Sequence, residues 1–239
     1  MRKDTHFLFF SDQISKEVLL LNSDEVAHLS QVLRFDIGDE IEVTNGKGMI
    51  YSCKIEKMKR DQALCSIISS RKEPAIDPQI TLYVGIPDKE RFDQICEMLP
   101  PLNTYKIVPV AMKNCTKNWW SKKWDKTAQR TERKVIASMK QSRNPYKTIV
   151  TEPLTFEEAL DTVASPLIFA DAGGKKLAHI FDTPPQELAL FIGPPAGFSA
   201  EEVVQLKERG EVLDLGPYRM RTELAAVVAV GLLGQQVTL

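Results

Sequence analysis

The sequence predicts an α/β protein with a small β-rich domain at its N-terminal end. Residues 1–73 contain short strand-like runs separated by turn signals. From residue 79 onward, apolar strand-like runs alternate with helical patterns, which is typical of a mostly parallel sheet. Two prolines within residues 74–78 indicate a linker between these parts. We therefore expect a small β-barrel domain over 1–73, a linker over 74–78 and an α/β domain over 79–239.

Composition places the chain among soluble globular proteins. Its 239 residues are 43% hydrophobic and 26% charged, which is ordinary for such proteins. No apolar run approaches the roughly 18 residues that a membrane helix requires, and the apolar stretch Phe7–Phe10 is too short for a signal peptide. The 4 cysteines form no CxxC pair and the 3 histidines are scattered. We expect reduced thiols, no metal, no membrane association and a cytoplasmic location.

Positive charge is concentrated in one segment. Between Lys113 and Lys147 there are eleven lysines and arginines but only two acidic residues, although the whole chain has a net charge of -1. All 3 tryptophans, Trp119, Trp120 and Trp124, lie in the same segment. Cations with interleaved aromatic rings suit a nucleic acid surface. An amphipathic helix with tryptophans in the core is the other interpretation, and the pattern alone favours neither.

In the N-terminal part, alternation predicts strands over Glu40–Thr44, Met49–Ile55 and Ala63–Ser69. Asn45–Gly46 follows the first strand as a turn signal. Apolar residues at helical spacing predict one helix over Asn22–Leu33. A small barrel with one helix accommodates these elements.

In the C-terminal part, Ile80–Ile86 is an apolar strand, and a helix from Phe92 to Leu99 ends at two prolines. A capping box of Ser199 and Glu202 predicts the start of another helix, which Gly210 ends. The remaining expected elements are strands over Ile107–Val108, Leu167–Ala170, Leu188–Ile192 and Val212–Leu215, and helices over Lys122–Ser142 and Thr222–Leu233.

Two loops lie where a parallel sheet binds its ligands, after the carboxyl ends of strands. One is Gly193–Ser199 and the other is Leu215–Glu223, and each leads into a predicted helix. Their glycines allow a close approach of the backbone, and the helix starts offer free N–H donors. No nucleophile elbow, dinucleotide fingerprint or phosphate loop is present in the sequence.

These loops resemble the signature of the SPOUT methyltransferases, and more specifically of the RsmE-type ribosomal RNA uridine-N3 methyltransferases. The first family loop reads roughly GPEGGFS and the second roughly LGxxILRxETA. The resemblance continues over nearly the whole chain in the same order, and the other matching positions are His28–Leu29, Val32–Arg34, Gly38–Asp39, Asn45–Gly48, Lys89, Arg91–Phe92 and Gln141–Ser142.

The resemblance implies a PUA-like N-terminal β-barrel that helps to bind RNA. It implies a SPOUT-type α/β domain with a deep trefoil knot, S-adenosylmethionine as the cofactor and a homodimer. The implied reaction is methylation of ring N3 of a uridine in small-subunit ribosomal RNA. Arg221 would stabilise the developing uridine anion, and Glu223 would accept a proton or orient Arg221.

The resemblance also implies the binding residues. The expected cofactor contacts are Leu167, Phe169, Ile192, Gly193, Pro194, Gly197, Leu215, Gly216, Met220, Arg221, Thr222 and Ala225. The expected RNA contacts are Arg34, Lys89, Arg91, Lys122, Lys123, Lys126 and Arg143. For Arg34, a surface ion pair is an equal alternative.

Some positions depart from the family pattern. Pro195 and Ala196 replace a Glu-Gly pair, Pro100–Pro101 lies in a segment that usually carries charges, and Tyr218–Arg219 replaces Arg-Ile. Proline removes a backbone donor, and alanine disfavours a positive φ. A non-catalytic RNA-binding or ribosome-assembly protein with the same fold is therefore the alternative to an active methyltransferase.

Overall fold

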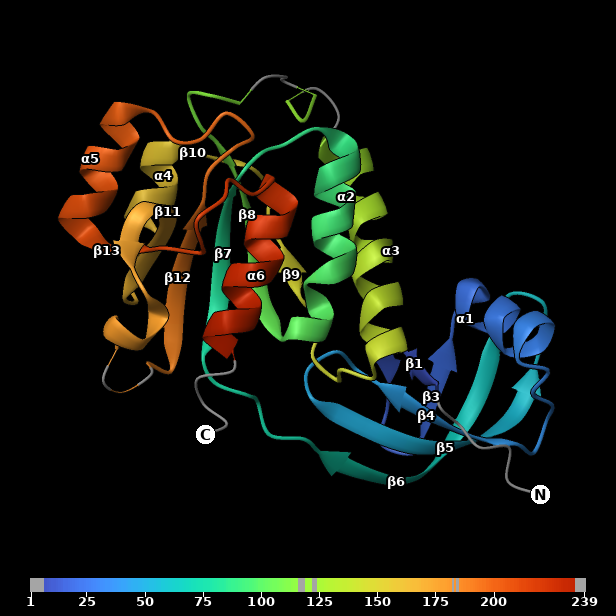
Figure 1. Ribbon diagram of the computed structural model, residues 1–239. Helices are drawn as coiled ribbons and strands as arrows, with labels where there is room; N and C mark the ends of the chain where they lie inside the picture. Colours follow the sequence, from blue (N-terminus) through green and yellow to red (C-terminus); the bar gives the residue numbers. More distant parts are fainter. Residues whose placement is uncertain (1–6, 116–118, 122–123, 182, 184, 235–239) are drawn as a thin grey trace. The chain divides into compact units, whose positions relative to one another are not determined.

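The computed structural model describes residues 7–115, 119–121, 124–181, 183 and 185–234 (Figure 1). The chain forms two compact units. The N-terminal unit comprises residues 1–75 together with 139–147, and the large unit comprises 76–138 and 148–239. Inclusion of residues 139–147 in the first unit is a feature that the sequence did not indicate.

The N-terminal unit is built on a six-stranded sheet in the order β1-β4-β5-β6-β3-β2. The alternation that predicts strands in residues 40–69 is confirmed, although β5 and β6 are longer than expected. The predicted helix is a short α-helix followed by a π-helical turn over His28–Val32. The elements are β1 (Leu8–Phe10), β2 (Gln13–Ile14), β3 (Val18–Leu21), α1 (Ser23–Ala27), β4 (Glu40–Thr44), β5 (Met49–Met58) and β6 (Ala63–Lys72).

Residues 139–147 join this unit through specific contacts. Lys140 forms an ion pair with the buried Glu25 of α1. Arg143 pairs with Glu42 of β4, and Lys47 and Tyr146 form an isolated bridge between backbones. These contacts explain why the end of a helix that begins in the large unit belongs to the N-terminal unit.

The large unit contains a seven-stranded sheet in which every pair of strands is parallel. Its order is β10-β8-β7-β12-β11-β13, and β9 also pairs with β8. The strands are β7 (Gln79–Gly85), β8 (Thr104–Ala111), β9 (Ile149–Val150), β10 (Leu154–Thr155), β11 (Leu167–Lys175), β12 (Glu187–Ile192) and β13 (Gly210–Leu213).

Helices cover both faces of this sheet (Figure 1). In β7, Ile80, Leu82 and Val84 pack into one core with residues of α2, α3 and α6, whereas Tyr83 packs into the opposite core with residues of α4 and α5. This period of two is expected of a strand buried on both faces. The helices are α2 (Lys89–Met98), α3 (Trp124–Ser142), α4 (Phe156–Asp161), α5 (Ala200–Arg209) and α6 (Thr222–Gly234).

The structure confirms the α/β class and the expected helices and strands of the large unit, with shifts at their ends. The capping box of Ser199 and Glu202 is present at the start of α5. The sequence analysis missed β1 to β3, β9, β10 and α4, which are short. None of the helices within the described residues is long and apolar enough to cross a membrane.

Candidate functional site

A cavity of about 460 Å³ lies at the carboxyl ends of β11, β12 and β13 in the large unit. Its walls are the loop after β12, the loop between β13 and α6, and residues Ala170–Ala172 of β11. Nine of the predicted cofactor contacts line it: Ile192, Gly193, Pro194, Gly197, Leu215, Gly216, Met220, Thr222 and Ala225. The two loops singled out from the sequence therefore face one shared space.

Three predicted cofactor contacts do not line this cavity. The side chains of Leu167 and Phe169 are buried in the core. The prediction included them because the end of their strand was expected to form a wall, but only Ala170 and the two residues after it reach that edge. Arg221 is exposed just before α6, where its carbonyl oxygen accepts the N–H of Ala225 at 2.8 Å.

The first loop is a tight turn that leads into α5. The N–H of Gly197 donates to the carbonyl oxygen of Pro194 at 2.8 Å, so Pro195 occupies the second position of the turn, where proline is favoured. Gly197 has φ +84, but Ala196 has a negative φ. The substitutions Pro195 and Ala196 are therefore compatible with the geometry of this loop.

Hydrogen bonds hold this loop in place from two sides. Glu202 accepts the N–H of Ser199 at 2.7 Å and the N–H of Lys113 at 2.8 Å. The amide of Asn114 donates to the carbonyl oxygen of Gly197 at 3.0 Å. The capping carboxylate thus connects the loop to the residues that follow β8.

The second loop is tied to the first by side chains. Arg219 donates to the carbonyl oxygen of Pro195 at 2.8 Å, and the hydroxyl of Thr222 donates to that of Gly193 at 3.2 Å. Gly216 has φ +141, a conformation that favours glycine. These contacts give the cavity a preformed shape on the side where the two loops meet.

Two carboxylates that the sequence analysis missed line the cavity, Asp171 and Asp214. Asp214 accepts the N–H of Gly216 at 2.8 Å and pairs with Lys176 at 2.6 Å, and these hydrogen bonds lower the pKa of its carboxyl group. Asp171 is exposed and accepts the N–H of Ala172 at 2.9 Å. No motif marks these positions, because an isolated aspartate after a strand is common in loops.

Glu223, the predicted proton acceptor, is buried at the start of α6, with 8% of its surface exposed. Its Oε1 lies 3.9 Å from Nε of Arg91, and its Oε2 is buried without a hydrogen-bond partner among the described residues. Arg91, which we expected to contact RNA, therefore faces Glu223 and Asp88. The ion pair described for Glu223 is the one with Arg91, and its two expected roles, as proton acceptor or as the residue that orients Arg221, stay predictions.

Among the described residues, several cations of the basic segment are paired with carboxylates. Arg143 is paired with Glu42, and the other cations of the segment that are paired with carboxylates are Lys113, Arg130, Lys134 and Lys140. Arg34, Lys89 and Lys126 are exposed. Lys122 and Lys123 lie outside the described residues.

The tryptophans belong to the core, which resolves the two interpretations of the basic segment. Trp120 is buried. Trp119 and Trp124 pack against Phe92 with ring centroids 6.0 and 6.4 Å apart, and the Trp119 indole donates to the carbonyl oxygen of Pro87 at 2.9 Å. In this arrangement their rings stabilise α2 and α3 instead of offering faces to nucleic acid bases.

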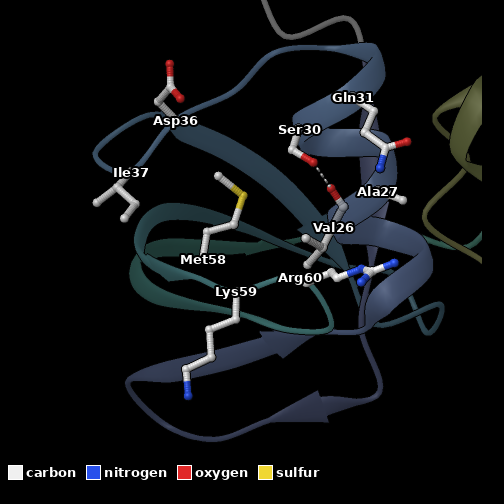
Figure 2. A pocket seen from close by; sticks show the side chains of 9 residues that line it. All are labelled: Val26, Ala27, Ser30, Gln31, Asp36, Ile37, Met58, Lys59 and Arg60. Atoms are coloured by element: carbon white, nitrogen blue, oxygen red, sulfur yellow. Dashed lines mark hydrogen bonds between the residues drawn. The ribbon is translucent and has the colours of Figure 1, made fainter.

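A second cavity of about 520 Å³ lies within the N-terminal unit (Figure 2). Val26, Ser30 and Gln31 line it from the helical side, and the hydroxyl of Ser30 donates to the carbonyl oxygen of Val26 at 2.9 Å. Lys59 and Arg60 contribute cations from the turn between β5 and β6. Sequence reasoning did not single out these two residues, because they lie in an ordinary polar turn.

A doubly covered parallel sheet with a preformed cavity at the carboxyl ends of its strands defines the class: an α/β protein that binds a small ligand. The family model for an RNA methyltransferase domain matches residues 74–234, and that for an RNA methyltransferase PUA domain matches residues 21–68. The chain belongs to the RNA methyltransferase family. The resemblance to the RsmE type inferred from the motifs is confirmed, as is the PUA-like nature of the N-terminal domain.

Relatives cover almost the whole chain. The ribosomal RNA small subunit methyltransferase E of Aquifex aeolicus is 26% identical over 95% of this chain and 98% of its own length. The protein of the same name from Mycobacterium bovis is 24% identical over 95% of this chain and 90% of its own length. A Legionella pneumophila methyltransferase solved with bound SAM has a TM-score of 0.85 at 25% identity, covering 95% and 96% of the two chains. Ribosomal RNA small subunit methyltransferase E of Neisseria gonorrhoeae, bound to S-adenosyl methionine, has a TM-score of 0.84 at 24% identity, covering 95% of each chain.

Proposed function

We propose that this protein uses S-adenosylmethionine to methylate ring N3 of a uridine in small-subunit ribosomal RNA. The observation that carries this proposal is the cavity formed jointly by the two loops that resemble the RsmE signature. The ribosomal RNA small subunit methyltransferases E that match the chain over nearly its full length support methylation of small-subunit ribosomal RNA. We also propose that the protein is located in the cytoplasm, where ribosomes assemble.

The residues present fit the cofactor. A volume of about 460 Å³ lies within the range of about 300–1,000 Å³ that small-molecule sites occupy. Backbone at Gly193, Leu215 and Gly216 can bind polar edges of the ligand. Asp171 and Asp214 supply negative charge to the cavity, which suits a cationic ligand. When bound, S-adenosylmethionine supplies an electrophilic methyl group on a sulfonium sulfur.

The protein's part in the reaction is to orient the base and handle one proton. Uridine N3 carries a hydrogen and lies on the pairing edge, so the base must be unpaired to be reached. Glu223, which follows Thr222 of the cavity wall, would accept that proton. Arg221, exposed at the start of α6, would stabilise negative charge on the uracil oxygens.

RNA binding would use both units. The N-terminal unit offers Lys59 and Arg60 beside its cavity, and exposed Arg34. The large unit offers exposed Lys89 and Lys126. We expect these exposed residues to provide most of the contacts with phosphates.

We extend the proposal to the homodimer and the trefoil knot that the resemblance implies. The dimer is supported by α6, on which Leu224 and Leu232 are 49% and 41% exposed and lie at helical spacing. Leu232→Glu should convert a dimer to a monomer in size-exclusion chromatography with light scattering. A measured mass of 26.9 kDa for the wild-type protein, which is the mass of a single chain, would overturn the dimer.

The alternative, an RNA-binding protein without activity, receives no support from the departures near the cavity. Pro195 and Ala196 fit their turn, and Arg219 connects the two loops. Pro100 begins a 3₁₀ turn (Pro100–Leu102) after α2. None of these changes fills the cavity.

The test has a binding arm and a reaction arm. Calorimetry should show saturable binding of S-adenosylmethionine, near micromolar, that Asp214→Asn weakens and Glu208→Gln, an exposed control on α5, leaves unchanged. Small ribosomal subunits lacking the modification should then gain N3-methyluridine, detected by mass spectrometry of nucleosides. Folded protein that binds no cofactor would favour the RNA-binding alternative.

A further inference from the structure

The buried carboxylate of Glu223 has an arrangement that the proposed function does not by itself require. Its side chain is 10% exposed, and in the part of the chain that the structure describes its buried Oε2 has no hydrogen-bond partner. Buried polar atoms are nearly always hydrogen-bonded, so an exception of this kind points to a functional role. Its Oε1 faces Nε of Arg91 at 3.9 Å, a distance at which the charges attract but no hydrogen bond forms.

Arg91 is itself held in place at the start of α2. Asp88 caps this helix by accepting the N–H of Arg91 at 3.0 Å. The same carboxylate lies 3.2 Å from Nε of Arg91, so one residue fixes both the backbone and the guanidinium group. The side chain of Arg91 is 31% exposed, and its charge is permanent. Asp88, Arg91 and Glu223 thus form a charged row from α2 to α6.

This row lies next to the cavity loops. Helices α2 and α6 pack side by side (Figure 1). Glu223 follows Thr222, which lines the cavity and donates to the carbonyl oxygen of Gly193. On the other side, β7 leads directly to Asp88, and a Cβ at Gly85 would lie 2.4 Å from the nitrogen of Pro194. The segments that carry Glu223 and Asp88 therefore both adjoin the first cavity loop, through Thr222 and Gly85 respectively.

We infer that Arg91 is a positioning residue that holds the Glu223 carboxylate as the acceptor of the uridine N3 proton. This inference rests on the proposed function and gives Arg91 a role other than RNA binding. As N3 loses its proton to Oε2, its electron pair forms the bond to the methyl carbon. The electron pair of the broken carbon–sulfur bond stays on sulfur, and Glu223 later returns the proton to water.

The geometry explains why an arginine at this distance is useful. A close pair with two hydrogen bonds would occupy both carboxylate oxygens and compete with the substrate proton. Asp88 attracts the guanidinium group at 3.2 Å and thereby keeps it from closing onto Glu223. The charge of Arg91 then stabilises the carboxylate, while its buried Oε2 keeps no hydrogen-bond partner among the described residues.

The test compares Arg91→Gln, Arg91→Lys and Glu223→Gln with the double variants that combine each Arg91 change with Glu223→Gln. The control is Glu90→Gln, at an exposed position of the same turn. The measurements are single-turnover methylation at saturating RNA, cofactor affinity by calorimetry and RNA affinity by filter binding. We expect Glu223→Gln to slow methylation about 100-fold, as loss of a general base does. Arg91→Gln should slow it at least tenfold, Arg91→Lys should restore part of the rate, and both affinities should stay within twofold of wild type.

The double variant decides between positioning and independent roles. Arg91→Gln combined with Glu223→Gln should be no slower than Glu223→Gln alone, because a positioning residue has nothing left to hold. Multiplying effects, or an Arg91→Gln that weakens RNA affinity and leaves the single-turnover rate unchanged, would overturn the inference. Failure of the proposed function looks different: the wild-type protein would then methylate no uridine at all.

Discussion

At the scale of the residue, Gly85 shows how closely β7 approaches the cavity. A Cβ at this position would lie 2.4 Å from the backbone nitrogen of Pro194. Because the backbone fixes the position of a Cβ, no side-chain rotation could relieve this contact. Gly85→Ala should therefore displace the first loop, weaken binding of S-adenosylmethionine at least tenfold and destabilise the protein by about 1–3 kcal/mol. Calorimetry with the cofactor and urea unfolding would measure these effects.

A glycine with free space around it provides the control. A Cβ at Gly231 in α6 would meet nothing within 4 Å, and alanine favours helix. Gly231→Ala should bind the cofactor normally and gain up to about 1 kcal/mol of stability. Equal cofactor affinity for Gly85→Ala and wild type would contradict the close approach.

The residue scale also shows what motifs can and cannot predict. Nine of the twelve predicted cofactor contacts line the cavity because loop motifs carry local backbone geometry in their glycines and prolines. The partner of Glu223 could not be predicted, since Arg91 is brought to it only by the packing of α2 on α6. Asp171 and Asp214 were missed for the same reason: their importance depends on which strand ends are adjacent.

At the scale of the element, the last turn of α3 is anchored to α1 by a buried ion pair. The side chains of Lys140 and Glu25 are 15% and 4% exposed, and Nζ lies 2.5 Å from Oε1. Lys140→Met would leave the carboxylate buried and unpaired, so we expect a loss of about 3–5 kcal/mol in the free energy of unfolding. Addition of Glu25→Gln should recover most of this loss, as urea unfolding can show.

The same helix supplies the matched control. Lys134 pairs with Glu97, whose side chain is 49% exposed, so the pair is solvated. Lys134→Met should cost no more than about 1 kcal/mol. If Lys140→Met cost as little, the ion pair would not be what anchors the end of α3 to the N-terminal unit.

The ion pair between Arg143, within residues 139–147, and Glu42 makes the stability of the protein depend on pH. Burial raises the pKa of Glu42, but hydrogen bonds and charge from Arg71 and Arg143 outweigh it and hold the pKa below its ordinary value of 4.5. A lowered pKa in the folded state means that the stabilisation is complete above pH 4.5 and is lost as the pH falls through the folded value. Because both arginines are partly exposed, we expect a contribution of no more than about 1 kcal/mol.

The measurement is urea unfolding of wild type and Glu42→Gln at several pH values. The two proteins should differ at pH 7 and converge as the pH falls below 4.5 and through the lowered pKa of folded Glu42, because the wild-type carboxylate then becomes protonated. A difference that stayed constant across this range would show that the carboxylate charge contributes nothing.

Element prediction succeeded where the hydrophobic pattern was long. Strand β12 and helices α5 and α6 follow directly from apolar runs and caps. Strands of two to four residues, such as β2 and β3, carry too few residues for a period to be visible. In the charged segment, composition alone could not show that Arg130 and Lys134 of α3 would face the carboxylates of α2.

At the scale of the whole molecule, the N-terminal unit is not a simple N-terminal segment. Residues 139–147 return to it from α3, so the ion pairs of Glu25 with Lys140 and of Glu42 with Arg143 form only after more than half of the chain is present. A linear reading of the sequence assigns such a segment to the domain in which it lies. Prolines can indicate where one domain ends, but they cannot show that a later segment of the chain packs against the first domain.

Ion pairs within the molecule also limit how many cations can contact RNA, and therefore how strongly the affinity for RNA depends on salt. Lys126 is exposed, whereas Arg130, one turn later in α3, donates to Asp93 at 3.0 Å. If Lys126 contacts a phosphate, Lys126→Gln should weaken RNA binding for all sequences and reduce the slope of log affinity against log salt by about 0.7–0.9. Arg130→Gln should leave the slope unchanged and lower stability instead. Filter binding of small-subunit RNA between about 50 and 200 mM salt tests both variants. An equal loss of slope in the two would mean that Arg130 leaves Asp93 to bind RNA, and the basic segment would then act as the free patch that its composition first indicated.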